Sequence, residues 1–125
     1  MHLYVIYVYF LHLVLFDTPI FSRLLDNYLS DESYRELQRA LMDNPELGDV
    51  MPGTGGLRKV RWHDTRRGKG KRGGLRIIYY YLMSDRQIWL LTLYGKDEAA
   101  DLNADEKRAL KKAIETELDA RRRSS

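Results

Sequence analysis

The chain has no cysteine, only three histidines and only three prolines among its 125 residues. The absence of cysteine excludes a disulfide scaffold, a thiolate zinc site and catalysis by a thiol. No carboxylate cluster or histidine spacing indicates a metal site, so we expect no metal and no other cofactor. The longest apolar stretch, residues 3–16, is too short to span a bilayer, which takes about 20 residues.

The apolar stretch also lacks the marks of an export signal. No Lys or Arg precedes it, since the first is Arg23, and no small-residue cleavage site follows it. We therefore expect a cytoplasmic protein. The β-branched and aromatic residues of Tyr4–Phe16 favour a buried strand, although the usual length is five or six residues. Either this strand is long, or about the first ten residues are an appendage.

The remaining composition is that of one globular domain. With 44% apolar and 31% charged residues, the chain is too hydrophobic for a disordered polymer and long enough to bury one core. We expect residues 1–125 to form a single domain, with residues 1–11 as a possible N-terminal extension.

Positive charge is concentrated in one segment. Residues 58–76 hold nine Lys or Arg residues and one carboxylate, a net charge of +8, while the rest holds twelve basic and seventeen acidic residues, or −5. Such a segment is typical of a surface that binds a polyanion, because neutralised phosphates release their counterions. A solvated basic loop that docks an acidic protein is the alternative.

Two short helices are predicted after the apolar stretch. Asp17-Thr18-Pro19 is a helix start with a side-chain cap and a proline in the first turn, and apolar residues at helical spacing continue it over residues 19–28. Ser30 with an acidic first turn begins a second helix, which Pro45 ends. Two such helices in succession indicate an antiparallel hairpin.

Three strands follow, over residues 57–62, 75–83 and 88–94, and a final helix follows Asn103. The order β-α-α-β-β-β-α predicts an α+β fold, in which the helices cover one face of an antiparallel sheet and the other face is left to water or a ligand. The basic run 63–74 joins the first two of these strands. Its four glycines and its repelling charges favour ordering only when a partner binds.

Three motifs in combination resemble a known family. They read LMDNPELGDVMPGTGGLRKVRW, GKGKRGGLRIIYYYL and IWLLTLYGKDEAADLNADEKRAL. Together they are similar to the RelE/ParE superfamily of toxins, and most of all to its HigB-type, host-inhibition branch, over about residues 14–118. The resemblance implies a RelE-like fold and a metal-independent endonuclease that cuts messenger RNA in the ribosomal A site. It also implies a cognate HigA-like antitoxin with a helix-turn-helix domain, through which alone the protein would meet operator DNA.

Cleavage by an internal 2′-hydroxyl needs one group to remove a proton, one to stabilise charge at phosphorus and one to protonate the leaving oxygen. The histidines, at positions 2, 12 and 63, form no plausible pair. The resemblance implies that lysines and arginines carry these roles instead. The matching positions, with a tyrosine as a weaker member, are Lys59, Arg61, Arg76, Lys96 and Tyr94.

Within this set we expect Arg76 to contact the scissile phosphate and Lys96 to act as an acid or charge stabiliser. Lys59 and Arg61 would position the RNA backbone. Crowded cations lower a lysine pKa from about 10.4 toward neutrality, whereas an arginine keeps its proton and stabilises charge. The group that removes the proton is left open. Some relatives carry an arginine where this chain has Asp97, which places more of the work on Lys96.

A second set is assigned to holding ribosomal or messenger RNA: Arg58, Lys69, Lys71, Arg72 and Tyr80. A glycine-rich loop suits electrostatic binding, and a tyrosine can stack on a base, although core packing is the preferred interpretation for Tyr79. Two other functions fit the same fold: a ParE-like inhibitor of DNA gyrase and a passive RNA-binding module. The basic set at positions 59, 61, 76 and 96 favours RNA chemistry, since a gyrase inhibitor has no need of it.

Overall fold

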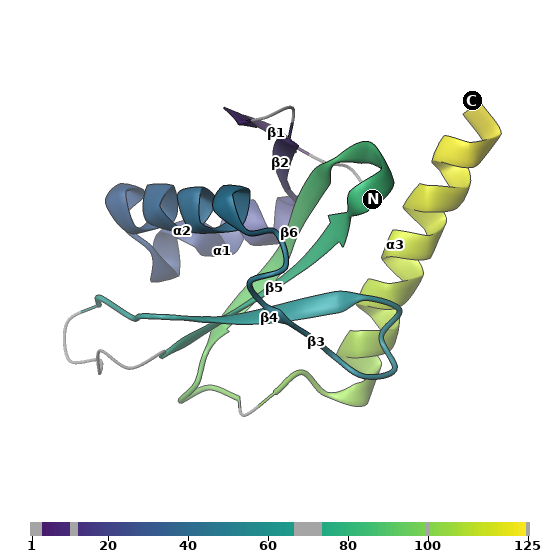
Figure 1. Ribbon diagram of the computed structural model, residues 1–125. Coiled ribbons are helices and arrows are strands. Elements are labelled where there is room, and N and C mark those ends of the chain that lie inside the picture. The colour runs from purple at the N-terminus through teal and green to yellow at the C-terminus, as the bar shows by residue number, and fades with distance from the viewer. Residues whose placement is uncertain (1–3, 11–12, 67–73, 100, 125) are drawn as a thin grey trace.

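The computed structural model describes residues 4–10, 13–66, 74–99 and 101–124, with the backbone alone for 4–10 and 124. It has an α+β fold with a helical hairpin and a C-terminal helix, which confirms the predicted class (Figure 1). The elements are β1 (Tyr4–Phe10), β2 (Leu13–Asp17), α1 (Pro19–Tyr28), α2 (Asp31–Asp43), β3 (Asp49–Val50), β4 (Leu57–Trp62), β5 (Leu75–Leu82), the 3-10 turn η1 (Met83–Asp85), β6 (Gln87–Gly95) and α3 (Ala104–Ser124).

The strands form one six-stranded sheet in the order β1-β2-β6-β5-β4-β3. β5 is antiparallel to β4 and to β6, as expected for strands joined in sequence. β2, however, runs parallel to β6, from Val14 opposite Gln87 to Asp17 opposite Leu90, so the sheet is mixed. The connection between β2 and β6 contains two helices and three strands, and a connection of that length leaves both directions open.

The apolar N-terminal run forms two strands. β1 pairs antiparallel with β2, with Tyr4 opposite Asp17 and Phe10 opposite Leu13. The run is therefore not one long strand, because folding back gives each of two strands an ordinary length. Leu13 and Leu15 are fully buried under the helices, which makes β2 an inner strand of the sheet.

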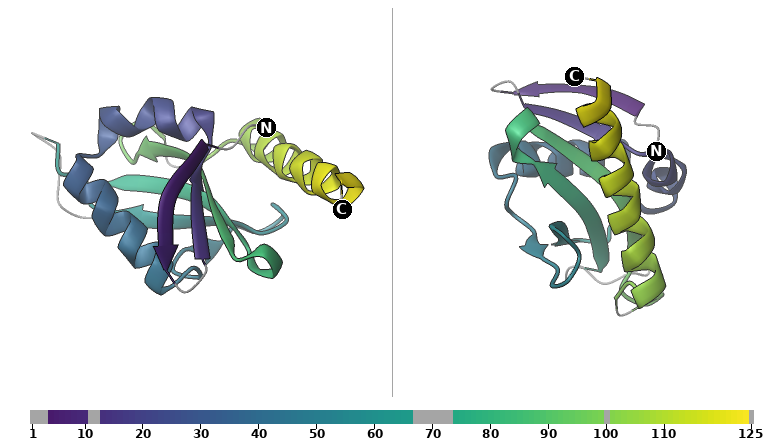
Figure 2. Two further views of the ribbon diagram at one scale, coloured as in Figure 1. Left: turned by 90° about the horizontal axis from the view of Figure 1, so that it is seen from above. Right: turned by 90° about the vertical axis from the view of Figure 1, so that its right-hand side faces the viewer.

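Both helices of the hairpin begin where their capping residues predict. The Thr18 hydroxyl accepts a hydrogen bond from the backbone N–H of Phe21 at 3.3 Å, and the Ser30 hydroxyl accepts one from Ser33 at 3.1 Å. α1 and α2 cover one face of the sheet, where Phe21 and Leu37 are fully buried. Figure 2 shows this helical pair and α3 on opposite sides of the strands.

The second face of the sheet is covered in part by α3, where the sequence had indicated a face open to water or a ligand. Ile114 of α3 packs with Ile78, Trp89 and Leu91 in a second core cluster. Towards the other end of α3, the Arg121 guanidinium lies 4.8 Å from the centre of the Trp89 ring. One apolar stripe on the helix is enough to close this half of the face, because the strand residues opposite it are also apolar.

Candidate functional site

The predicted basic residues meet on the α3 face of the sheet, beyond its apolar half. Arg61 of β4 lies opposite Arg76 of β5, and Arg76 lies opposite Tyr94 of β6. Lys59 is two residues from Arg61 and therefore points to the same face. We call Lys59, Arg61, Arg76 and Tyr94 the basic cluster. The register makes its members neighbours across three strands.

Arg61 and Arg76 occupy directly opposed positions on adjacent strands. Arg76 is only 8% exposed, and its Nη1 donates to the carbonyl of Leu75 at 3.2 Å, whereas Arg61 is exposed to solvent. Like charges in opposed positions destabilise an antiparallel pair. The sheet therefore holds one guanidinium in a nearly buried, fixed place with a second beside it, an arrangement that favours an anion between or above them.

Asp101, in the segment between β6 and α3, contacts two members of the cluster. Its Oδ1 lies 3.6 Å from Lys59 Nζ and accepts a hydrogen bond from the Tyr94 hydroxyl at 3.4 Å, while its Oδ2 lies 3.2 Å from Lys107 Nζ. Burial works to raise the pKa of Asp101, but the backbone N–H of Leu102 and the two ammonium groups outweigh it and lower that pKa. Asp101 is thus an ionised side chain that links β4, β6 and α3.

Tyr94 is a neutral hydrogen-bond donor at ordinary pH. Burial, followed by the charge and the hydrogen bond of Asp101, raises the pKa of its phenol to about 12, and Arg76 acts in the opposite direction. The side chain is 9% exposed. Tyr94 is therefore suited to donate a proton or a hydrogen bond, and unsuited to remove a proton.

Lys96 lies two residues beyond Tyr94, in the turn that follows β6, and its side chain is exposed. Its backbone N–H donates to the carbonyl of Gly74 at 2.7 Å. Gly74 is the last residue of the basic run 63–74, so the turn that carries Lys96 is hydrogen-bonded directly to one end of that run.

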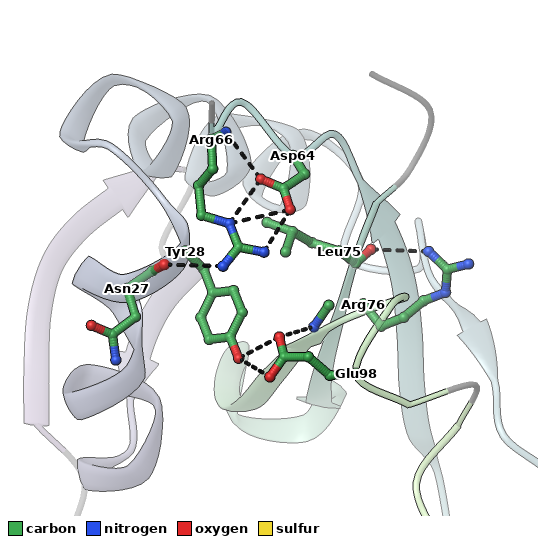
Figure 3. A network of polar contacts seen from close by, with 8 residues as sticks. Asn27, Tyr28, Asp64, Arg66, Leu75, Arg76 and Glu98 are labelled. Atoms are coloured by element: carbon green, nitrogen blue, oxygen red, sulfur yellow. Dashed lines mark hydrogen bonds and ion pairs between the residues drawn. The ribbon is translucent and has the colours of Figure 1, made fainter. Parts of the chain in front are cut away.

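A polar network on the α1 side fixes the same turn (Figure 3). The Tyr28 hydroxyl donates to both oxygens of Glu98, at 2.7 and 2.8 Å, and Glu98 also accepts from the backbone N–H of Gly95 at 3.0 Å. The Arg66 guanidinium lies 4.6 Å from the centre of the Tyr28 ring and 2.7 Å from the Asp64 carboxylate. Both flanks of residues 67–73 are therefore connected to the segment that bears Lys96, while Figure 3 shows Arg76 apart from this network.

Two of the residues assigned to RNA binding, Arg58 and Tyr80, belong to the described part of the chain. Arg58 is on the opposite face from Lys59 and donates to the carbonyls of Gly48 and Glu46, at 2.7 and 3.3 Å. Tyr80 is half-buried on the α3 face, with its ring centre 5.4 Å from that of Trp89. Lys69, Lys71 and Arg72 lie outside the described residues. The role of all five in RNA binding stays a prediction.

The expected core tyrosine is confirmed, since Tyr79 is fully buried and its hydroxyl donates to the Pro45 carbonyl at 2.8 Å. His63 stacks on Trp62 and lies 3.7 Å from Glu36 of α2, away from the basic cluster. Within the described ranges, no group of three or more His, Cys, Asp or Glu side chains is placed to hold a metal ion.

Asp101 and Lys107 are the candidate site residues that the sequence did not reveal. Both belong to an acidic and basic stretch in which five carboxylates occur between residues 97 and 106. Only the fold shows that one of them faces Lys59 and Tyr94.

Solved structures of known proteins include neighbours of this fold. No protein-family model matches the sequence. Among solved structures, the chain is similar to the free state of a double mutant of the Escherichia coli toxin RelE, with 13% sequence identity and a TM-score of 0.44 over 69% of this chain and 85% of that chain. None of the helices in the described part of the chain is both long and apolar enough to cross a membrane.

Proposed function

We propose that this protein is the toxin of a type II toxin–antitoxin system, a HigB-type endonuclease that cuts messenger RNA on the ribosome. The observation that carries the proposal is the opposition of Arg61 and Arg76, with Lys59 and Tyr94 on the same face. This crowding costs the sheet stability and suits a phosphodiester, whose negative charge grows in the transition state. A local arrangement that disfavours folding is typical of a functional site.

The burial of each side chain supports a division of roles. Arg76, held nearly buried in the sheet, contacts the scissile phosphate, because a fixed guanidinium stabilises charge without reorganising. The exposed Arg61 and the partly exposed Lys59 position the neighbouring backbone. Tyr94 and Lys96 supply the proton or charge for the leaving oxygen. Asp101 is a positioning residue, since it contacts both Lys59 and Tyr94.

The partners follow from the same proposal. Lys69, Lys71 and Arg72 hold ribosomal or messenger RNA, with contributions from Arg58 and Tyr80. The protein works in the cytoplasm. It needs no metal ion, since its catalytic groups are cationic side chains. A HigA-like antitoxin neutralises it and brings it to operator DNA.

Primer extension on messenger RNA tests the proposal. Cells expressing the wild-type chain are compared with cells expressing Arg76→Ala, and Arg39→Ala on the exposed surface of α2 serves as a matched control. We expect cuts that disappear when translation is blocked, that are absent in Arg76→Ala and that persist in Arg39→Ala. The nuclease proposal fails if the wild-type chain makes no translation-dependent cuts, or if Arg76→Ala cuts equally well.

Two further assays distinguish messenger cleavage from the two other functions. A gyrase inhibitor would block supercoiling of plasmid DNA by purified gyrase, and the Arg76→Ala change would leave that inhibition intact. A passive RNA-binding module would leave growth unaffected when it is expressed without an antitoxin.

A further inference from the structure

A cavity of about 220 Å³ lies between the loop that follows β3 and the first turns of α3. It is lined by Gly53, Ala104, Lys107, Arg108 and Lys111. Three of these five residues are cations, and Lys111 lies four residues after Lys107 and three after Arg108, which makes it a neighbour of both on the helix surface. The cavity adjoins the basic cluster, because Lys107 and Lys59 contact the same carboxylate, that of Asp101.

The loop wall of the cavity is held in shape by Thr54. Its buried hydroxyl donates to the carbonyl of Met51 at 2.6 Å and accepts from the backbone N–H of Leu57 at 3.1 Å. Gly53 and Gly55 have φ angles of 73° and 75°, which favour glycine. A Cβ atom at Gly55 would lie 3.5 Å from the Lys111 side chain, whereas one at Gly53 would meet nothing within 4 Å. The loop thus packs against Lys111 and stays open at Gly53.

The cations of the cavity are available to an incoming anion. Lys107 pairs with Asp101, and Arg108 contacts Asp105, but those two carboxylates are 41% and 88% exposed. Ion pairs between exposed side chains contribute little to stability, so a phosphate can replace either carboxylate. Lys111 adds a third positive charge, and the amino end of α3 adds the partial charge of its dipole.

We propose that this cavity binds a second phosphate of the RNA strand whose scissile phosphate lies at the basic cluster. On binding, Lys107 exchanges the Asp101 carboxylate for a phosphate oxygen, and Lys111 and Arg108 contact the same group. The nature of the strand rests on the proposed function, but the binding of a phosphate group by the cavity does not. The strand runs from β4 and β5, past Asp101, to α3.

The test compares two neighbouring lysines of one helix. Lys111→Glu and Lys112→Glu make the same change of charge at exposed positions of α3, but only Lys111 lines the cavity. Affinity for a fluorescently labelled single-stranded RNA of about ten nucleotides is measured over a range of salt concentrations. We expect Lys111→Glu to weaken binding about tenfold and to reduce the salt slope by about one, and Lys112→Glu to change affinity by less than about threefold. Equal losses in the two variants would overturn the proposal.

A second arm uses inorganic pyrophosphate and the backbone N–H signals of Gly53 and Gly55. We expect these signals to shift on titration in the wild-type chain and in Lys112→Glu, and to shift far less in Lys111→Glu. Unmoved signals in the wild-type chain overturn the cavity as a phosphate site. If the cavity binds as expected while the wild-type chain cuts no messenger, the proposed function fails and the phosphate site stands. If messenger is cut and the two variants bind RNA equally, the phosphate site alone fails.

Discussion

On the side of the sheet covered by α1 and α2, the buried carboxylates of Asp17 and Asp64 each have a partner of their own, whereas on the α3 side two lysines share the carboxylate of Asp101. Asp17 accepts from the Tyr34 hydroxyl at 2.6 Å, and Asp64 pairs with Arg66 at 2.7 Å. Around Asp101, by contrast, two lysines compete for one side chain. The first arrangement pairs its charged groups within the fold, whereas the second leaves two ammonium groups sharing one carboxylate.

The largest expected effect is a change with pH in the free energy of unfolding, and it comes from Asp17 on the side covered by α1 and α2. Burial raises its pKa to about 6, although the hydrogen bond from Tyr34 works to lower it. The folded chain therefore binds this proton more tightly than the unfolded chain, whose carboxyl titrates near 3.8. The stability that this group contributes is fully present below about pH 4 and is lost as the pH rises through 6, by roughly 3 kcal/mol.

Urea unfolding between pH 4 and 7 measures this effect as a difference between the wild-type chain and Asp17→Asn. The asparagine keeps an acceptor for the Tyr34 hydroxyl but does not titrate. The free energy of unfolding of the wild-type chain should fall relative to that of the variant between about pH 4 and 6 and remain level above that range. Parallel curves throughout would show that Asp17 is not a buried titrating group.

A smaller effect is expected at Tyr28, which also lies on the α1 side. Tyr28→Phe removes the hydroxyl that donates to Glu98, and a lost hydrogen bond to a charged group costs about 2 kcal/mol. Tyr81→Phe is the control, because the half-buried Tyr81 forms no hydroxyl hydrogen bond among the described residues. Chemical denaturation should show the loss for Tyr28→Phe only. Equal losses would mean that the Glu98 contact contributes nothing of its own.

On the α3 side, we expect Asp101→Asn to change the free energy of unfolding less than Tyr28→Phe does, and to change the affinity for RNA. The variant loses two partly exposed ion pairs, so its free energy of unfolding should drop by no more than about 1 kcal/mol. It also releases Lys59 and Lys107 for phosphate, and we expect affinity for single-stranded RNA to rise severalfold. Fluorescence anisotropy at fixed salt provides the measurement. Weaker binding by a folded variant would rule out competition between Asp101 and RNA.

The smallest change is expected for Arg61→Gln, and it has the opposite sign. Removing one of two opposed guanidinium groups should raise the free energy of unfolding by a few tenths of a kcal/mol. Arg39→Gln, on α2, removes the same charge away from the sheet and should leave stability unchanged. Differential scanning calorimetry of both variants makes the comparison. A drop in stability for Arg61→Gln would show that Arg61 supports the fold and does not strain it.

Local signals predicted the elements well. The caps at Thr18 and Ser30 locate the first turns of α1 and α2, because a cap acts within three residues of itself. The strands predicted over residues 57–62 and 75–83 match β4 and β5 to within one residue. These predictions needed only neighbours in sequence.

The remaining features depend on contacts between distant segments. The alternation of side chains along β2 does not indicate that its neighbour is β6 or that the two strands are parallel. The apolar stripe of α3 does not say which face of the sheet it covers. Asp101 resembles four other carboxylates near it in sequence, and only the meeting of β4, β6 and α3 sets it apart.

The most direct test of the basic cluster is the rate of messenger cleavage by Arg76→Gln in a purified translation system, measured alongside its unfolding by urea. The glutamine keeps a polar side chain at the same place but cannot balance the charge of a phosphate. We predict a rate at least about 100-fold below that of the wild-type chain. The variant should remain folded, and Arg76→Lys should recover part of the rate. Cleavage by folded Arg76→Gln at the wild-type rate would contradict the assignment of this cluster to RNA cleavage.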